Sequence, residues 1–542
     1  MVSKKRKSGK ENRAVYAAAL SLILLLGAGL TLGFFYGITP LNLSDNYLYG
    51  EWAHHISVVG ITGFAGLGAD GMKYFVIGGT AILYSLFGAS SLTSVLFDLA
   101  TFLGTIVVVY LIGSELYNRK VGLVSSLLYC AFPLAVLETA SGGDDVPMAF
   151  FVSLAVLTLL LAMKGRRKAF YALSGFFGVA GFLTVPEALI IVPFLLLLLL
   201  ADTIMHLDRK QLSLIASFAV GIACAVALIA LLGYLTAGDP LYIYHVDSSW
   251  YTNYCYNVNC TLSFAPLQTY LGELLPFQVL GGAQQIIANP TAAYLQGAIH
   301  ASLVNASINW QGYMIGAYFY VAIVSAAYLL LKRDKRVAVP GLWILATLLY
   351  LSFGTMSLQH WLPVQPQYQR FTLIFGPAIA LLIGFFIIRF TERKGKEKKR
   401  KGRLMKAKYV LAVAIVLLLL LPSYYTIRFL GYSQYSYLYP LLRAADFINA
   451  LPPGTTVLRP NTVPVDEYTN YKANLQYGPY DGCGGISNGT YVVDFANATL
   501  EEECNLTVAF GPQARPEWLD PYIPSLYDFF GNFTDITVYY RK

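Results

Sequence analysis

Two short loops beside apolar segments carry acidic residues of the kind that activate a hydroxyl group. Asp45 follows the first apolar run, and Tyr49 would lie one turn further along the same side of a helix. Asp144 and Asp145 stand side by side in a turn between two long apolar runs. Carboxylates are costly at a membrane boundary, so their presence there indicates function. A second interpretation stays open, because Asp45 or one of the paired acids would also serve to cap the following helix.

Isolated basic residues provide the complement that an anionic leaving group needs. Lys73 is the only Lys or Arg between the first apolar run and Arg119, and it precedes a short apolar segment. Arg370 begins a late apolar run, with His360 in the loop before it, and Glu187 lies in an apolar turn. We predict that Lys73 and Arg370 bind a phosphate; the alternatives are snorkelling for Lys73 and a structural ion pair for Arg370. A carboxylate base with cations that hold a departing phosphate suits attack on a lipid-linked phosphate ester.

The composition places these residues in a membrane protein. Of the 542 residues, 56% are hydrophobic and only 13% are charged, against roughly 25% charged in soluble proteins. Many apolar runs reach the roughly 20 residues that cross a bilayer, which excludes a soluble multi-domain enzyme. We predict a polytopic α-helical membrane protein of about eleven transmembrane helices, near residues 16–36, 92–113, 121–139, 147–163, 169–185, 188–206, 212–236, 313–331, 337–353, 371–390 and 409–429.

The distribution of charge sets the expected topology. The net charge is +8, but Lys and Arg gather in the N-terminal tail and in alternate loops. This is the positive-inside pattern rather than a nucleic-acid surface, so we expect a cytoplasmic N-terminus in a cell or ER membrane. Residues 74–88 are expected to lie on the outer surface, because counting them as a span would place the later basic loops outside.

Features of an oxidising compartment fall on the predicted outer side. Two local disulfides are predicted there, Cys255–Cys260 and Cys483–Cys504. Cys130 and Cys224 lie within apolar runs and are expected to be small buried side chains. We also expect N-glycosylation of seven N-x-S/T sequons on this side, at Asn42, Asn259, Asn305, Asn488, Asn497, Asn505 and Asn532.

The composition changes after Tyr435, where acidic residues, Pro, Gly and Asn increase. We therefore predict a membrane domain over residues 1–432 and a soluble extracytoplasmic α/β domain over residues 433–542. An amphipathic helix is expected at Tyr439–Ala450, stopped by the Pro-Pro-Gly that follows Leu451. Short strands are expected at Thr456–Leu458, Thr490–Phe495, Leu506–Phe510 and Ile536–Tyr540.

The order of several short motifs resembles the GT-C glycosyltransferases, especially the family 39-like group of protein mannosyltransferases and aminoarabinose transferases. Members carry an acid shortly after the first span, matched by Asp45, and a lysine before a short apolar stretch, matched by Lys73 without the family's proline pair. Tyr110–Lys120 resembles the family's Y-L-L-G-x-x-L-F-x-R-R motif, and Asp145–Phe151 resembles its D-x-P-L-x-F-F motif. Arg370–Pro377 resembles the R-Y-x-L-x-x-x-P motif, and Asp446–Gly454 resembles the start of the family's outer domain.

The resemblance implies an inverting enzyme that passes one sugar from a dolichyl- or polyprenyl-phosphate carrier to a hydroxyl of a protein or lipid-linked glycan. It implies Asp45 as the general base, with Asp144 or Asp145 as an assisting acid. No cofactor is implied with certainty, although the adjacent acids would suit Mg²⁺ or Mn²⁺. Nucleic acid is not an expected partner. The expected substrate contacts are Lys73, Arg370, Tyr49, Glu187 and His360.

Three other functions stay open. A transporter or flippase for lipid-linked sugars would place functional charges deep within its spans. An oligosaccharyltransferase-like catalytic subunit belongs to the same superfamily, but its Trp-Trp motif has no counterpart in this sequence. A non-catalytic scaffold would tolerate substitution of Asp45 and of the paired acids.

Overall fold

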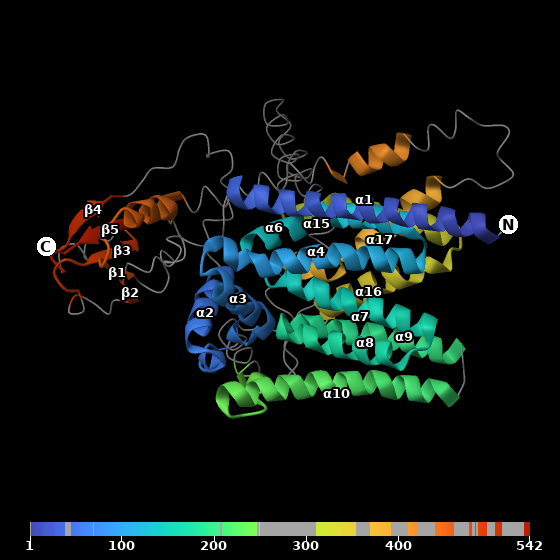
Figure 1. The fold of residues 1–542 in the computed structure, drawn as a ribbon, viewed down its shortest axis with the longest axis horizontal. Helices are drawn as coiled ribbons and strands as arrows, with labels where there is room; N and C mark the ends of the chain where they lie inside the picture. Colours follow the sequence, from blue (N-terminus) through green and yellow to red (C-terminus); the bar gives the residue numbers. More distant parts are fainter. Residues whose placement is uncertain are drawn as a thin grey trace, which may run out of the picture.

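The computed structural model is a bundle of long helices with a small β-sheet at one end (Figure 1). The chain's N-terminus lies at the other end of the bundle. We call these two ends the sheet end and the N-terminal end. The structure describes residues 2–37, 45–246, 249, 310–353, 369–391, 410–420, 439–459, 476–479, 483, 486–495, 504–511 and 536–541, except 69, 206–208 and 418.

Within the described residues, six helices are long and apolar enough to cross a membrane, or seven if one bent pair counts as a single span. The bent pair is α5 (Arg119–Cys130) and α6 (Pro133–Ser141), which meet at 54°. The six lie in α1 (Val2–Gly37), α4 (Ser91–Leu116), α7 (Asp145–Gly165), η4 with α9 (Pro186–Ile190 and Ile191–Met205), α10 (Arg209–Ala237) and η6 with α17 (Gln369–Phe375 and Gly376–Thr391).

Further apolar helices complete the bundle: α8 (Lys168–Ala180), α15 (Trp310–Leu331) and α16 (Ala338–Phe353). Every apolar run predicted up to residue 390 coincides with one or two of these helices. The run near 409–429 falls only partly within the described residues. The polytopic helical fold is therefore confirmed, whereas the total of eleven spans stays a prediction.

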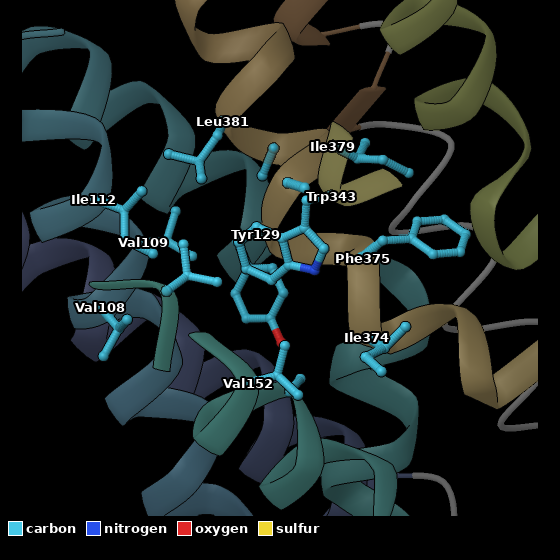
Figure 2. Close-up of a cluster of buried hydrophobic side chains, with 14 of the residues drawn as sticks. Val108, Val109, Ile112, Tyr129, Val152, Trp343, Ile374, Phe375, Ile379 and Leu381 are labelled. Atoms are coloured by element: carbon cyan, nitrogen blue, oxygen red, sulfur yellow. The ribbon is translucent and has the colours of Figure 1, made fainter. Parts of the chain in front are cut away.

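The bundle's core lies where α4, α5, α7, α16 and α17 meet (Figure 2). Tyr129 and Trp343 are fully buried there, together with Phe375 from η6. By contrast, only about a fifth of the apolar window of α10 is buried inside the bundle. Cys224 lies on α10 and is exposed, so the expectation that it is buried was wrong; Cys130 is buried as expected. Helix α10 packs mainly on α8 and to a lesser extent on η1 (Ile61–Phe64), and most of its apolar window is uncovered.

Two short helices lie at the sheet end of the bundle (Figure 1): α2 (Asp45–Val59) and α3 (Tyr74–Phe87). They pack against each other and bury a small core of their own that includes Tyr49 and Ile77. With 14 residues, α3 is about 21 Å long, which is shorter than the roughly 30 Å hydrocarbon core of a bilayer. This length agrees with the prediction that residues 74–88 do not span the membrane.

The C-terminal part contains helical residues 439–449 and a five-stranded mixed sheet in the order β2-β1-β3-β5-β4. Strand β1 pairs in parallel with β2 and β3, while β5 is antiparallel to β3 and β4. The four expected strands are present as β1 (Thr456–Arg459), β3 (Tyr491–Phe495), β4 (Thr507–Phe510) and β5 (Ile536–Tyr540); β2 (Gln476–Pro479) was not expected.

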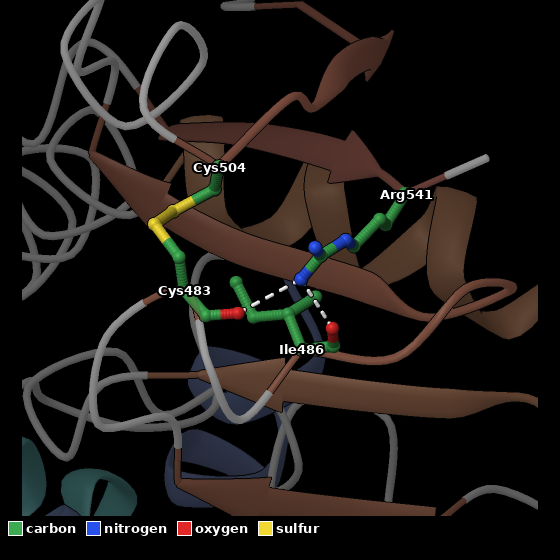
Figure 3. The surroundings of a disulfide bond; sticks show 4 residues. All are labelled: Cys483, Ile486, Cys504 and Arg541. Carbon is green, nitrogen blue, oxygen red and sulfur yellow. Dashed lines mark hydrogen bonds between the residues drawn. A yellow bond between two sulfur atoms is a disulfide. The ribbon is translucent and has the colours of Figure 1, made fainter.

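A disulfide joins Cys483 to Cys504, as predicted (Figure 3). The guanidinium group of Arg541 donates a hydrogen bond of 2.8 Å to the carbonyl oxygen of Cys483 and another bond to that of Ile486. The end of β5 is thereby held against the disulfide-linked segment. The predicted Cys255–Cys260 disulfide lies outside the described residues.

Candidate active site

Three side chains from separate elements meet at the sheet end of the bundle. Lys73 Nζ lies 2.5 Å from Asp144 Oδ2 and also donates a hydrogen bond to the hydroxyl of Tyr49. The Tyr49 hydroxyl in turn donates to Asp144 Oδ2 at 3.3 Å, and Lys73 Nζ is 4.5 Å from the centre of the Tyr49 ring. An ammonium, a carboxylate and a phenol therefore form one closed triangle of polar contacts.

Each corner of this triangle comes from the end of a helix or its first turns. Lys73 immediately precedes α3, Asp144 immediately precedes α7, and Tyr49 lies in the second turn of α2. All three are buried, with Lys73 8%, Asp144 1% and Tyr49 2% exposed. Burial makes the ion pair expensive to break, because either partner alone would be a desolvated charge. Snorkelling of Lys73 to the surface is therefore not what the structure shows.

A tight turn at Gly142 and Gly143 places Asp144 and Asp145 at the start of α7. Gly142 ends α6 in the left-handed conformation, with φ 78°, which a side chain would disfavour. A Cβ added to Gly143 would lie 2.2 Å from Glu138 Oε2, so that carboxylate packs directly over the turn. Asp144 makes no side-chain capping bond to α7, so the interpretation of Asp144 as a simple cap is wrong. Asp145 is fully buried as the first residue of α7.

Two further acids stand near this turn, and both were missed from the sequence. Asp98 of α4 is 1% exposed and interacts electrostatically with Asp144 and with Glu138 of α6. Its Oδ1 atom accepts no hydrogen bond in the described part of the chain. The signal for both acids was present in the sequence, since each is a charge within an apolar run.

The structure locates the other predicted site residues less completely. Asp45 is the first residue of α2, one helical turn before Tyr49 and on the same face, and its side chain lies outside the described part. The same holds for the side chain of Arg370, whose element η6 packs against α7. Glu187 is buried in η4, which also packs against α7, and His360 lies outside the described residues.

Metal ligands do not gather in this region as far as the structure describes it. Among the described residues, no group of three or more His, Cys, Asp or Glu side chains is arranged to hold a metal ion. The side chain of Asp45 does not belong to that set. The divalent metal expected as one option therefore stays a prediction.

The arrangement combines the parts that phosphate chemistry needs. Lys73 and Asp144 form a buried ion pair, and the carboxyl group of Asp98 interacts electrostatically with those of Asp144 and Glu138. Because the site is shielded from water, these charges act more strongly than they would in solution.

Comparison with known proteins gives a family match for part of the chain and a fold for most of it. Residues 79–231, from α3 to α10, match the sequence profile of the dolichyl-phosphate-mannose-protein mannosyltransferase family. This segment includes Asp98, Glu138 and the paired acids Asp144 and Asp145. No curated protein matches the chain by sequence.

Solved structures resemble the chain over most of its length. ArnT from Cupriavidus metallidurans bound to undecaprenyl phosphate is 13% identical with a TM-score of 0.57, over 96% of this chain and 98% of that one. The Archaeoglobus fulgidus oligosaccharyltransferase tethered with an acceptor peptide is 14% identical with a TM-score of 0.52, over 94% of this chain and 74% of that one. The chain is thus a multi-pass membrane protein with the fold of the GT-C glycosyltransferases, and its residues 79–231 carry the sequence pattern of the dolichyl-phosphate-mannose-protein mannosyltransferase family.

Proposed function

We propose that this protein transfers one sugar from a dolichyl- or polyprenyl-phosphate carrier to a hydroxyl group of a protein or a lipid-linked glycan on the outer face of the membrane. The buried triangle of Lys73, Asp144 and Tyr49 at the sheet end carries this proposal. The undecaprenyl phosphate bound to ArnT, which has the same fold, supports a lipid phosphate as the group released.

The proposed reaction is a single displacement. Asp45 takes the proton of the acceptor hydroxyl, and the oxygen attacks the anomeric carbon of the donor sugar. The bond from that carbon to the phosphate oxygen breaks, and the polyprenyl phosphate leaves with both bonding electrons. One displacement inverts the anomeric centre. Asp45 is chosen because it begins the helix that also supplies Tyr49.

Lys73 and Arg370 hold the negative charge of the departing phosphate in this proposal. Lys73 is already paired with Asp144, so the phosphate binds by drawing the ammonium partly away from that carboxylate. Asp144 keeps the ammonium in place before the donor arrives. Asp145, Glu187 and His360 are proposed to complete the substrate site, and η6 with Arg370 lies against the helix that Asp145 begins.

The test uses purified protein in liposomes with a synthetic polyprenyl-phosphate mannose and a panel of other sugars on the same carrier. Asp45→Asn is expected to abolish transfer, since an amide cannot accept the proton, and to leave the melting temperature within a few degrees. Asp446→Asn, at an exposed acid of helical residues 439–449, is the matched control and is expected to stay active. Full activity of Asp45→Asn would refute the assignment, and loss of transfer with EDTA would establish a metal.

A transporter of lipid-linked sugars is the second candidate, because Asp98 and Glu138 lie within apolar helices. Movement of labelled carrier across the liposome without release of polyprenyl phosphate from any donor would favour it. Release that requires Asp45 would exclude it as the principal activity.

A further inference from the structure

An ion pair joins the C-terminal sheet to the helix that begins with Asp45. Arg459, the last residue of β1, places its Nη2 atom 2.9 Å from Oε1 of Glu51 in α2. The side chain of Arg459 is 8% exposed and that of Glu51 is 34% exposed. The two residues are 408 positions apart in the chain, so this contact forms only when the sheet is seated on the bundle.

Helix α2 lies between this ion pair and the buried triangle. Tyr49 and Glu51 are two residues apart, which places their side chains about 200° apart around a helix. Tyr49 accordingly contacts Lys73 and Asp144, whereas Glu51 contacts the sheet on the other side. The contact with Arg459 and the contacts with the buried triangle are therefore made by the same turn of α2.

The same sheet also rests on α4. Its core buries Phe35, from the end of α1, and Val95, from the second turn of α4, beside Val457 and Ile536 of the sheet. Val95 lies three residues before Asp98 and on the same side of the helix. The sheet thus contacts two of the helices that supply the polar groups of the site.

We propose that Glu51 and Arg459 are positioning residues, which couple the seating of the C-terminal domain to the placement of α2 in the active site. This inference rests on the proposed function for its kinetic consequence, and the domain contact itself is tested separately. With the pair intact, α2 holds Asp45 and Tyr49 where the acceptor and the donor phosphate meet. Without it, the carrier still binds but the groups that act on the acceptor are misplaced.

The experiment compares Glu51→Arg, Arg459→Glu and the double variant that exchanges the two charges. Each single reversal places like charges opposite each other and is expected to lower kcat for transfer at least tenfold, with the donor KM changed less than threefold. The exchange restores the opposite charges and is expected to regain at least a third of wild-type kcat. Arg443→Gln is the matched control, because it removes an exposed ion pair of the same domain, and it is expected to leave kcat unchanged.

A second readout does not depend on catalysis. Hydrogen–deuterium exchange in residues 45–59 is expected to speed up in Arg459→Glu, to recover in the exchanged variant and to stay unchanged in Arg443→Gln. Where a reversal does not fold, Arg459→Gln and Glu51→Gln replace it in both measurements. Folded variants with wild-type kcat and exchange, or an exchanged variant no better than the single ones, would overturn the inference. A wild-type protein without any transfer would refute the proposed function, while the exchange data would still decide on the coupling.

Discussion

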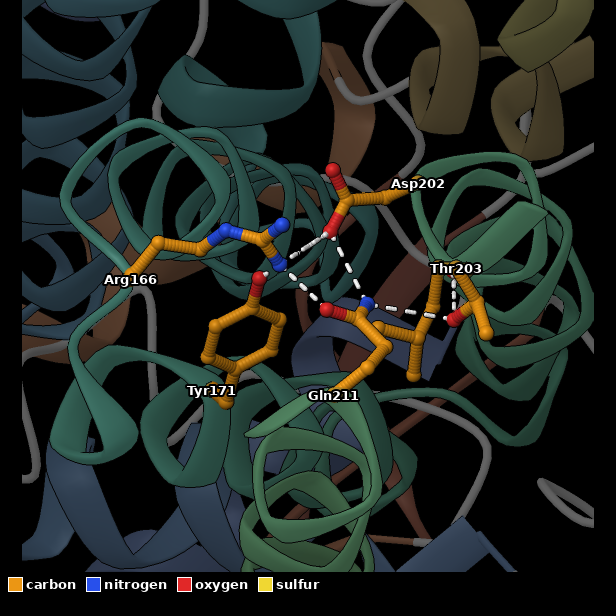
Figure 4. Close-up of polar contacts among 6 residues, drawn as sticks. Arg166, Tyr171, Asp202, Thr203 and Gln211 are labelled. Atoms are coloured by element: carbon orange, nitrogen blue, oxygen red, sulfur yellow. Dashed lines mark hydrogen bonds and ion pairs between the residues drawn. The ribbon is translucent and has the colours of Figure 1, made fainter. Parts of the chain in front are cut away.

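Buried aspartates lie beside both ends of α7, Asp144 just before the helix and Asp202 of α9 beside its last turn, and their electrostatic settings differ. The helix has 21 residues and is about 30 Å long, so the two sites lie on opposite sides of the bundle. At the N-terminal end, Asp202 Oδ2 accepts hydrogen bonds from Arg166 at 3.2 Å, Gln211 at 3.0 Å and Tyr171 at 3.3 Å (Figure 4). At the sheet end, Asp144 contacts Lys73 and Tyr49, but the carboxyl group of Asp98 lies close enough to interact electrostatically with Asp144 and Glu138.

This difference is the one expected between a structural site and a catalytic site. Donors from three segments converge on the single carboxylate of Asp202, and Gln211 also donates to Thr203, so α7, α8, α9 and α10 are tied together. Around Asp144 the neighbouring acids disfavour one another's ionisation, which lowers the stability that the site can contribute. Clusters of buried acids that disfavour one another's ionisation are common at functional sites. We infer that the N-terminal end is optimised for folding and the sheet end for substrate.

Replacing each aspartate by asparagine tests this difference with the largest expected effect. Asp144→Asn and Asp202→Asn each remove one partner of a buried ion pair. Asp202→Asn is expected to cost about 3 kcal/mol of stability, and Asp144→Asn less, because it also relieves the unfavourable interaction with Asp98. Per folded molecule, Asp144→Asn is expected to lower the transfer rate about 100-fold or more, because Lys73 loses the carboxylate that orients it. Asp202→Asn is expected to transfer within threefold of the wild-type rate. Sugar transfer normalised to the folded fraction on size-exclusion chromatography provides the measurement.

The comparison fails if the two variants behave alike. Equal and severe losses per folded molecule would mean that the Asp202 network also controls catalysis. Wild-type rates in both would remove Asp144 from the active site. The melting temperatures serve as the internal control, since both variants are expected to be destabilised.

Removing one hydroxyl from each site is expected to give a smaller effect. Tyr49→Phe and Tyr171→Phe each delete a donor to a buried aspartate, at 3.3 Å in both cases. Each is expected to lower stability by about 1 kcal/mol. Only Tyr49→Phe is expected to slow transfer, by about tenfold, which corresponds to about 1.4 kcal/mol in the barrier. The measurement is the initial rate of sugar transfer at saturating donor. A Tyr171→Phe variant that slows transfer as much as Tyr49→Phe would contradict the division between the two ends.

The positions of the helices could be predicted from the sequence, but the contacts between residues of different helices could not. Apolar runs of about 20 residues locate the helices, because a bilayer imposes that length. Lys73 was recognised as an unusual cation, but its pairing with Asp144 and Tyr49 brings together residues that are far apart in the chain. Lys73 lies 24 residues after Tyr49, and Asp144 lies 95 residues after it. No local pattern encodes such a contact. Strand β2 was missed because Gly478 and Pro479 are poor strand formers, and pairing with β1 overrides that preference.

Two buried acids that the sequence analysis did not select could have been recognised from the sequence. Asp98 and Glu138 are charges within apolar runs, and the cost of burying such charges marks them as functional candidates. Cys224 was expected to be buried because its run is apolar. In a membrane protein, however, an apolar residue is as well placed against lipid as against protein, so apolarity alone does not distinguish the two.

Asp334, a second acid at the N-terminal end, is expected to give the smallest effect on stability and the clearest pH dependence. Asp334 follows α15 and is bound by Arg336 through two hydrogen bonds, of 2.9 and 2.7 Å, with Arg389 at 3.6 Å. The hydrogen bonds from Arg336 hold the pKa of Asp334 below its usual range. A carboxyl group with a lowered pKa stabilises the fold above its unfolded pKa of about 4, and this contribution is lost as the pH falls through the lower folded value.

Asp334→Asn is therefore expected to be less stable than the wild type at pH 7, by about 1 kcal/mol or less, because Arg336 is partly exposed. The difference between the two proteins should shrink below about pH 4, as the wild-type carboxyl group takes up a proton. Melting temperatures measured in parallel from pH 7 down to 3 test this, and a difference that is constant or grows toward low pH would contradict it. Sugar transfer at pH 7 should be unchanged in the variant. That result would distinguish the N-terminal end, where Asp202 and Asp334 are each paired with an arginine, from the sheet end, where loss of Asp144 is expected to stop the reaction.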